Sequence, residues 1–192
     1  LRLVKNENYY DAENVKLDEI EYVMIVEGST AFSAFQSGEI DYTENVPADQ
    51  IVQLQEANDP NFKIFPYIGT YFYCFNMNDE LMKDVKVREA LSLAIDREAI
   101  VTNVTKGGQK PANGFVSEGI ATSTGESFRT LAGDYGVPVK ADIEKAKALL
   151  AEAGYPDGAG FPELELLYNT NEGHKAIAEA VQEMWKQNLG IN

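Results

Sequence analysis

The stretch that decides the fold is residues 84–104, which read DVKVREALSLAIDREAIVTNV. Its apolar residues fall at the i, i+3, i+4, i+7, i+8 spacing of one helix face. These residues are Val87, Ala90, Leu91, Ala94 and Ile95. Asp84 stands where an N-cap accepts backbone N–H bonds, and Asp96 is placed to cap a second helix that carries Ile100, Val101 and Val104. The spacing therefore predicts a buried helix and a second short helix, which meet at Asp96.

Composition sets limits on the class of protein. A chain of 192 residues with 44% hydrophobic side chains is long enough for one large domain or two small ones, with a real core. Sixteen basic residues stand against 31 acidic ones, which gives a net charge of -15. This surplus of negative charge argues against nucleic acid or anionic lipid as a partner, and it favours solubility.

Cys74 is the only cysteine, so an intramolecular disulfide and a cysteine-rich metal site are both excluded. It lies in the apolar run YFYCF at residues 71–75, which predicts a small, buried and inert thiol. The 192 residues contain neither a charged-then-apolar leader nor an apolar run of about 18 residues. We therefore expect a soluble chain without a targeting signal within these residues.

Helical and strand patterns alternate along the chain. Helical patterns begin near residues 28, 47 and 142, and a last one carries Ala176 to Trp185, whose indole we expect in the core. Strands are expected at residues 1–4, 20–26, 39–42, 63–67 and 164–168. This order predicts α/β architecture. Residues 106–139 are rich in glycine and loop-like, a kind of span that is usually functional or poorly ordered.

Candidates for catalysis are few, and we expect no catalytic residue, metal or cofactor. The only histidine, His174, could pair with Cys74 as base and nucleophile, but nothing around either residue favours this. Glu39 and Asp41 share one face of a predicted strand. This arrangement favours a solvated surface over the paired carboxylates of a glycosidase. Gly107-Gly108 lacks the rest of a phosphate loop, and so indicates a flexible turn.

Several motifs together resemble one family. Residues 87–101 match the pattern VRxALxxAIDRxxIV of the extracellular solute-binding proteins of oligopeptide and dipeptide ABC importers, family 5. Residues 8–11 and 37–41 resemble its NxxYxD and SGEID segments, and residues 148–155 and 167–170 resemble AxxLLAEAGY and LLYNT. The motifs occur in the family's order and cover nearly the whole chain.

The resemblance implies a fold and a division into lobes. The fold is a periplasmic-binding-protein-like α/β fold of the class II, cluster C type, here partial, with mixed sheets and flanking helices. Residues 1–68 would belong to the first lobe and residues 69–192 to the last lobe, with the crossing near residues 68–70. Family members are longer and begin with an export signal, so we interpret the chain as an internal segment.

The resemblance implies a role in transport, with no catalysed reaction. A monomeric receptor would capture oligopeptides between two hinged lobes and deliver them to a membrane ABC permease. It would lie in the periplasm, or at the extracellular face of the membrane as a lipoprotein. Relatives with the same fold bind a nickel chelate, haem or a signalling peptide. The identity of the ligand is therefore not determined by the resemblance. A carboxylate-dependent hydrolase is the alternative from another class, and it would require two buried acids that face one pocket.

The resemblance also implies ligand-binding residues. Alternation places Phe72 and Cys74 on one face, which matches the cleft face of the family. Relatives have a tyrosine and an acid at these positions, so the pockets here would be more apolar. Tyr67, just before the crossing, would also face the cleft.

Two basic side chains complete the expected site. His174 lies in a segment similar to YNTxxxHK, whose histidine reaches the carboxylate end of a bound peptide, and the N-terminus of a helix favours the same anion. Lys106 is a weaker candidate, because the basic residue of relatives aligns with Thr105. The family's main anchor for the peptide amino group lies beyond residue 192.

Overall fold

The computed structural model describes residues 1–133 and 135–192 as a set of helices with one small sheet. The chain divides into two compact units, Leu1–Pro47 and Ala48–Asn192. No helix within the described ranges is long and apolar enough to cross a membrane. The lobe assignment, with its crossing near residues 68–70, stays a prediction.

The first unit contains a hairpin and a helix. Strands β1 (Arg2–Val4) and β2 (Glu19–Glu21) pair antiparallel, with Leu3 opposite Ile20, and the short 3-10 helix η1 (Ala12–Asn14) lies between them. Helix α1 (Gly28–Ser37) buries Ala31, Phe32 and Ala34, and it ends at Gly38, which adopts a φ of 77°. Glycine reaches this left-handed conformation without strain, as the sequence predicts for a helix end.

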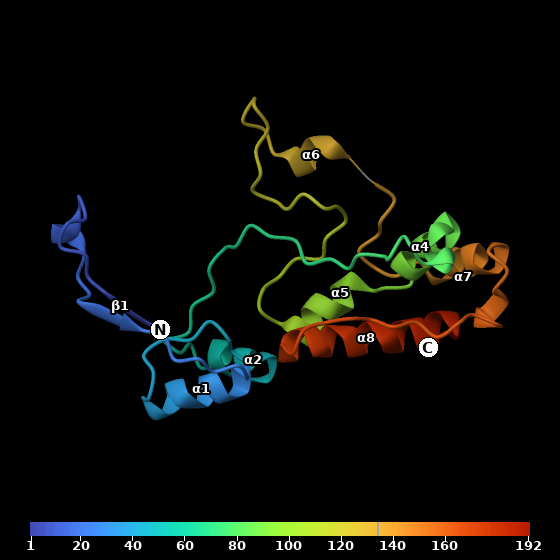
Figure 1. Ribbon diagram of the computed structural model, residues 1–192. Coiled ribbons are helices and arrows are strands. Elements are labelled where there is room, and N and C mark those ends of the chain that lie inside the picture. The colour runs from blue at the N-terminus through green and yellow to red at the C-terminus, as the bar shows by residue number, and fades with distance from the viewer. Residues whose placement is uncertain (134) are drawn as a thin grey trace. The chain divides into compact units, whose positions relative to one another are not determined.

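The second unit contains the remaining elements. They are α2 (Ala48–Glu56), α3 (Glu80–Lys83), α4 (Val85–Leu93), α5 (Arg97–Ala99), the π-helix η2 (Ile100–Thr105), α6 (Phe128–Ala132), α7 (Ile143–Glu152), the 3-10 helix η3 (Pro156–Gly158) and α8 (Glu172–Leu189). Figure 1 shows α4 beside α7, and α5 with η2 beside α8.

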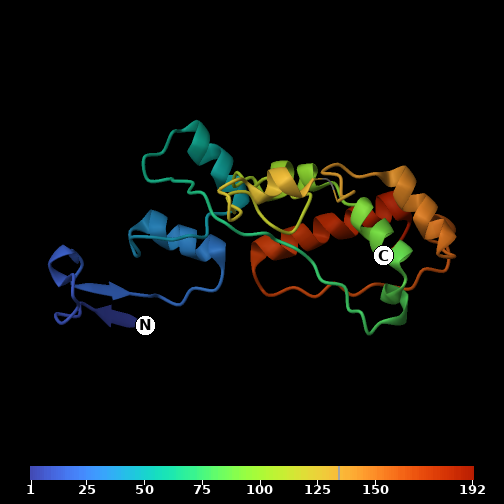
Figure 2. The ribbon, with the colours of Figure 1, turned by 90° about the horizontal axis from the view of Figure 1, so that it is seen from above.

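The core of the second unit forms around α4. Ala90, Leu91 and Ala94 are fully buried, and they pack with Leu150 of α7 and Leu189 of α8. In Figure 2 the long helix α8 passes close to α4 and α7. The predicted helical stripe is therefore confirmed in its main positions. Ile95 is only half-buried.

Aspartates begin three of the helices, as predicted. The Asp84 carboxylate accepts from the Lys86 N–H at 2.8 Å, and Asp96 accepts from the Ala99 N–H at 2.7 Å. Asp142 caps α7 in the same way, through the Lys145 N–H. These side chains satisfy backbone donors that have no partner within the helix. The second helix differs from expectation, because it continues beyond Ala99 as a π-helix.

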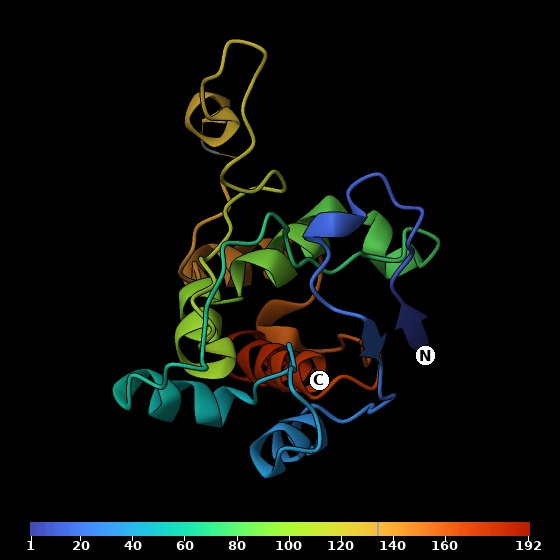
Figure 3. The ribbon, with the colours of Figure 1, turned by 90° about the vertical axis from the view of Figure 1, so that its left-hand side faces the viewer.

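The span 106–139 is partly ordered, since it contains α6 and an isolated antiparallel bridge between Ala121 and Ser127. In Figures 1 and 3 the segment that carries α6 extends away from α4 and α7. Its returning end is held at Val139, whose carbonyl accepts from the Arg97 and Glu98 N–H groups at 2.9 and 3.2 Å. Both ends of the span thus join the helical segment formed by α5 and η2, which follows the buried helix α4.

Several predicted strands are wrong. Residues 39–42, 63–67 and 164–168 form no strand, and the predicted strand at 20–26 is reduced to β2. A strand requires a neighbour that accepts and donates backbone hydrogen bonds. The stretch 164–168 makes one such bond, from the Leu164 N–H to the Asn192 carbonyl at 3.0 Å. These residues have strand-like patterns, but the described chain gives them no ladder.

Candidate functional site

The aromatic run at residues 71–75 contacts different partners with alternate side chains. The Tyr71 ring lies 5.7 Å from the Tyr73 ring and 5.3 Å from the His174 imidazole, centroid to centroid. Side chains two residues apart share a face of an extended chain. Tyr71, Tyr73 and His174 therefore form one cluster, which we call the tyrosine cluster.

Phe72 has its own partner. Its ring packs edge-on against Phe115 with centroids 4.9 Å apart and an interplanar angle of 66°. The Thr70 hydroxyl donates a hydrogen bond of 2.8 Å to the Phe115 carbonyl. We call Phe72 and Phe115 the phenylalanine pair. About half of the Phe72 side chain and two thirds of Phe115 stay exposed, at 53% and 67%.

The predicted site residues are thus divided between two groups. His174 contacts Tyr71, whereas Phe72 contacts Phe115. Between His174 and Phe72 there is no ring contact in the described part of the chain. Ligand contacts by both groups remain a prediction.

His174 is positioned by the start of α8. The Asn171 side chain accepts from the Gly173 N–H at 2.9 Å and from the His174 N–H at 3.2 Å. Asn169 in turn accepts from the Asn171 N–H at 3.1 Å. The cap already uses two of the backbone donors at this N-terminus. An anion bound here would therefore depend on the half-buried imidazole more than on those N–H groups.

Cys74 differs from the prediction, because its side chain is exposed and not buried. The alternation that turns Tyr73 inward turns Cys74 outward, and an exposed thiol can react with reagents in the solvent.

Tyr67 is 91% exposed, and its ring lies against Gly69, where an added Cβ would stand 2.8 Å from the ring edge. Lys106 is half-buried and ends η2 with a φ of 54°.

The Tyr73 hydroxyl is the most perturbed group of the tyrosine cluster. Burial raises the pKa of Tyr73 above its ordinary value, because the phenolate would lose its hydration. The neighbouring Tyr71 raises the pKa of Tyr73 further. The hydroxyl has no partner with good hydrogen-bond geometry in the described chain. It is neutral at physiological pH and is therefore a poor base.

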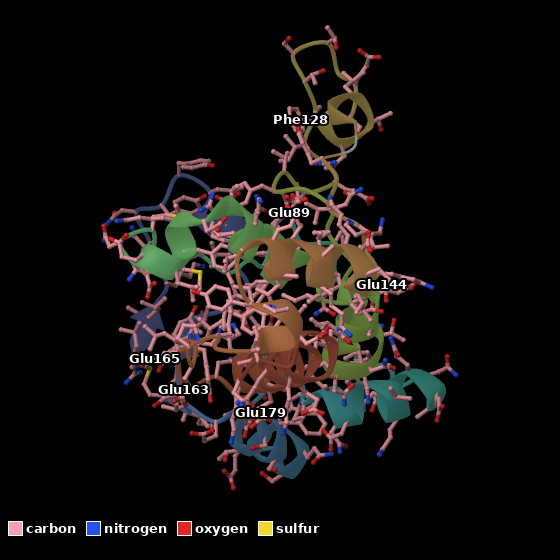
Figure 4. All side chains as sticks on the ribbon, turned by 90° about the vertical axis from the view of Figure 1, so that its right-hand side faces the viewer. Glu89, Phe128, Glu144, Glu163, Glu165 and Glu179 are labelled. Carbon is pink, nitrogen blue, oxygen red and sulfur yellow. The ribbon has the colours of Figure 1, made fainter. Side chains whose placement is uncertain are left out.

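Carboxylates do not gather in a pocket. Figure 4 shows Glu89, Glu144 and Glu179 on separate parts of the second unit, and Glu163 close to Glu165 on another segment. Within residues 1–133 and 135–192 no polar or charged residue is fully buried, and no group of three potential ligands could hold a metal ion. A hydrolase based on two buried acids finds no support in this arrangement.

Sequence reasoning did not select Tyr71, Thr70 or Phe115. The alternation of the aromatic run could have indicated Tyr71, because it shares a face with Tyr73. Phe115 stands between glycines in a loop-like span, and only the fold shows that this loop lies against Thr70 and Phe72. No local pattern predicts such a contact.

Known proteins of one family share the sequence and fold of this chain. The family of bacterial extracellular solute-binding proteins, family 5 middle, matches residues 1–192. The dipeptide-binding protein DppE and the oligopeptide-binding protein OppA of Bacillus subtilis are 38% and 35% identical, each over all of this chain and 34% and 35% of their own length. The structure of Haemophilus influenzae OppA in complex with the peptide RPPGFSPFR superposes with a TM-score of 0.84 and 28% identity, over 98% of this chain and 36% of that one.

The fold is that of solved periplasmic oligopeptide-binding proteins, in agreement with the predicted periplasmic-binding-protein-like α/β class. The chain belongs to the bacterial extracellular solute-binding proteins, family 5. It spans about a third of the length of the relatives it matches.

Proposed function

We propose that this chain is part of a receptor that captures short peptides outside the cytoplasmic membrane and delivers them to an ABC permease. The family match over all 192 residues carries this proposal. Peptide-binding relatives of similar sequence support it, and a structural neighbour is solved in complex with the peptide RPPGFSPFR. The receptor performs no chemistry, needs no cofactor and works as a monomer.

The proposed mechanism is closure of two hinged lobes around the ligand. Phe72 and Cys74 line one wall, Tyr67 lies near the crossing, and His174 binds the carboxylate end of the peptide. Lys106 gives weaker support to the same end. Because the chain spans about a third of its relatives, we expect residues 1–192 alone to bind peptide weakly or not at all. Submicromolar binding of a mixed peptide library to this chain, measured by calorimetry, would contradict that expectation.

The proposed location is the periplasm or, with a lipid anchor, the extracellular face of the membrane. Net charge of -15 is consistent with a soluble receptor that avoids nucleic acid. A nickel chelate, haem or a signalling peptide is the second candidate ligand on the same fold.

Ligand carried through native purification tests the proposal. The natural protein that carries these residues is purified without denaturation, and its bound ligands are released and measured by mass spectrometry. A ladder of mixed short peptides is expected. A single mass, or a metal complex or haem, would keep the fold and overturn the proposed substrate.

A further inference from the structure

One arm of the 106–139 span lies along the stretch that precedes the aromatic run. An added Cβ at Gly108 would stand 3.7 Å from the Ile64 side chain, and one at Gly119 would stand 3.7 Å from Ile68. Phe115 lies between Gly108 and Gly119 on this arm, and its carbonyl accepts a hydrogen bond from the Thr70 hydroxyl. The position of Phe115 is therefore fixed by several contacts along the arm.

The phenylalanine pair forms an open apolar corner. The edge-on geometry of the two rings leaves ring surface of both residues accessible, as their exposures of 53% and 67% show. On the same arm, Lys110 and Glu118 form an ion pair with each other, and the Arg129 guanidinium lies against Gly114, the residue before Phe115. The corner therefore presents apolar ring surface on an arm that also carries charged side chains.

We propose that Phe115 is a specificity-determining residue, which together with Phe72 receives an apolar side chain of the bound peptide. Thr70 is the positioning residue that holds Phe115 through its backbone. This inference rests on the proposed function, because it names the side chain that the peptide site prefers.

The size and polarity of the corner favour a single side chain as the occupant. Stable protein partners cover on the order of 800 Å² on each side, far more than two rings provide. An apolar side chain gains by leaving water against aromatic rings, whereas a polar one loses its hydration without a new partner. The same reasoning predicts a clear preference of leucine over serine at one peptide position.

Alanine pentapeptides that carry one leucine or one serine at each position in turn provide the test. Their Kd values are measured by calorimetry on the natural protein that carries these residues. Wild type should prefer leucine at one position, and Phe115→Ala should lower that preference about five- to tenfold. Phe115→Leu should retain most of it. Thr70→Val should lower it less, because the carbonyl contact is lost while the ring remains.

Phe65→Ala is the matched control, because Phe65 is an equally sized ring, 76% exposed, on the same stretch. This variant should keep the leucine preference. An unchanged preference in Phe115→Ala, an equal loss for all peptides, or a wild type that prefers no side chain would overturn the inference. Failure of the wild type to bind any pentapeptide would instead count against the proposed function.

Discussion

The indole Nε1 of Trp185 donates a hydrogen bond of 2.9 Å to the backbone oxygen of Leu91. This oxygen lies in the last turn of α4, and the Ile95 N–H that a regular helix would offer it bonds to Ser92 instead. One turn further along α8, the Asn188 amide donates to the Ala94 oxygen at 2.8 Å. Two side chains from α8 therefore satisfy two of the carbonyls at the end of α4, those of Leu91 and Ala94.

Trp185→Phe should lower the free energy of unfolding by about 1–2 kcal/mol, because the ring stays while the Leu91 oxygen loses its donor. Urea denaturation followed by circular dichroism measures the change. Gln187→Ala, on the exposed side of the same helix, should stay within about 0.5 kcal/mol of wild type. Equal stability of Trp185→Phe and wild type would show that the hydrogen bond contributes nothing.

Gly158 and Gly190 bring two backbone segments into close contact. An added Cβ at Gly158 would lie 2.6 Å from the Leu189 oxygen, and one at Gly190 would lie 2.6 Å from the Asp157 oxygen. Gly158→Ala should destabilise the protein by about 1–3 kcal/mol more than Gly160→Ala. Gly160 has a similar φ of 75° but open space at its Cβ, so the difference isolates the clash. Equal losses in the two variants would exclude that clash.

The helices could be predicted from the sequence because their signals are local. The apolar stripe around Leu91 and the capping aspartates Asp84, Asp96 and Asp142 depend only on neighbouring residues. The caps are confirmed, and so is the stripe except at Ile95, which is half-buried. Strands at residues 39–42, 63–67 and 164–168 depend on distant partners. Their apolar pattern gives no information on whether such a partner pairs with them, and so these predictions failed.

The site could be predicted only in part for the same reason. Alternation correctly separated Phe72 from Tyr71 and Tyr73. The apolar neighbours of Cys74 suggested burial, yet its side chain is exposed, because flanking residues do not tell which face other elements cover. The partnerships of Tyr71 with His174 and of Phe72 with Phe115 join distant residues, which only the fold brings together.

Arg97 should be required for the attachment of the 106–139 span. Its guanidinium donates to the Ser92 carbonyl and hydroxyl at 3.1 and 2.9 Å and to the Pro138 carbonyl at 3.4 Å, and burial lowers the pKa of Arg97. A lysine cannot reach these acceptors together. Arg97→Lys should therefore lower the free energy of unfolding by about 1–2 kcal/mol.

Hydrogen exchange gives the local evidence for this role of Arg97. The Arg97 and Glu98 amides, which bond to Val139, should exchange faster in Arg97→Lys. Lys140→Ala removes only the exposed pair with Glu98 and should leave both amides protected. Unchanged exchange of these amides in Arg97→Lys would show that the backbone bonds alone hold the span.

Tyr73→Phe should leave stability at neutral pH unchanged or raise it by up to about 1 kcal/mol, because it removes a buried hydroxyl that lacks a good partner. The folded-state pKa of Tyr73 is raised, so its contribution to stability is present below the ordinary pKa of about 10 and is lost as pH rises through the raised value. The free energy of unfolding, measured by urea denaturation from neutral to alkaline pH, should therefore fall less steeply for Tyr73→Phe than for wild type. If the free energy of the two proteins falls equally with pH, the Tyr73 hydroxyl is in contact with solvent in the folded state.

His174 should contribute to affinity through the carboxylate of the ligand. The imidazole packs on Tyr71 and stands in the first turn of α8, where the macrodipole also favours an anion. His174→Ala should weaken the binding of free-acid alanine peptides of one length by about tenfold, and should leave the matching C-terminal amides unchanged. Calorimetry on the natural protein measures both series.

Lys175→Ala is the control for His174, because Lys175 is the next residue of the helix and its ammonium faces Glu179 at 3.8 Å. This variant should affect acids and amides alike, and only slightly. If His174→Ala weakens the amides as much as the acids, the imidazole acts by packing on Tyr71 and the ligand carboxylate lies elsewhere. The difference between acid and amide, and not the total loss of affinity, therefore decides the role of His174.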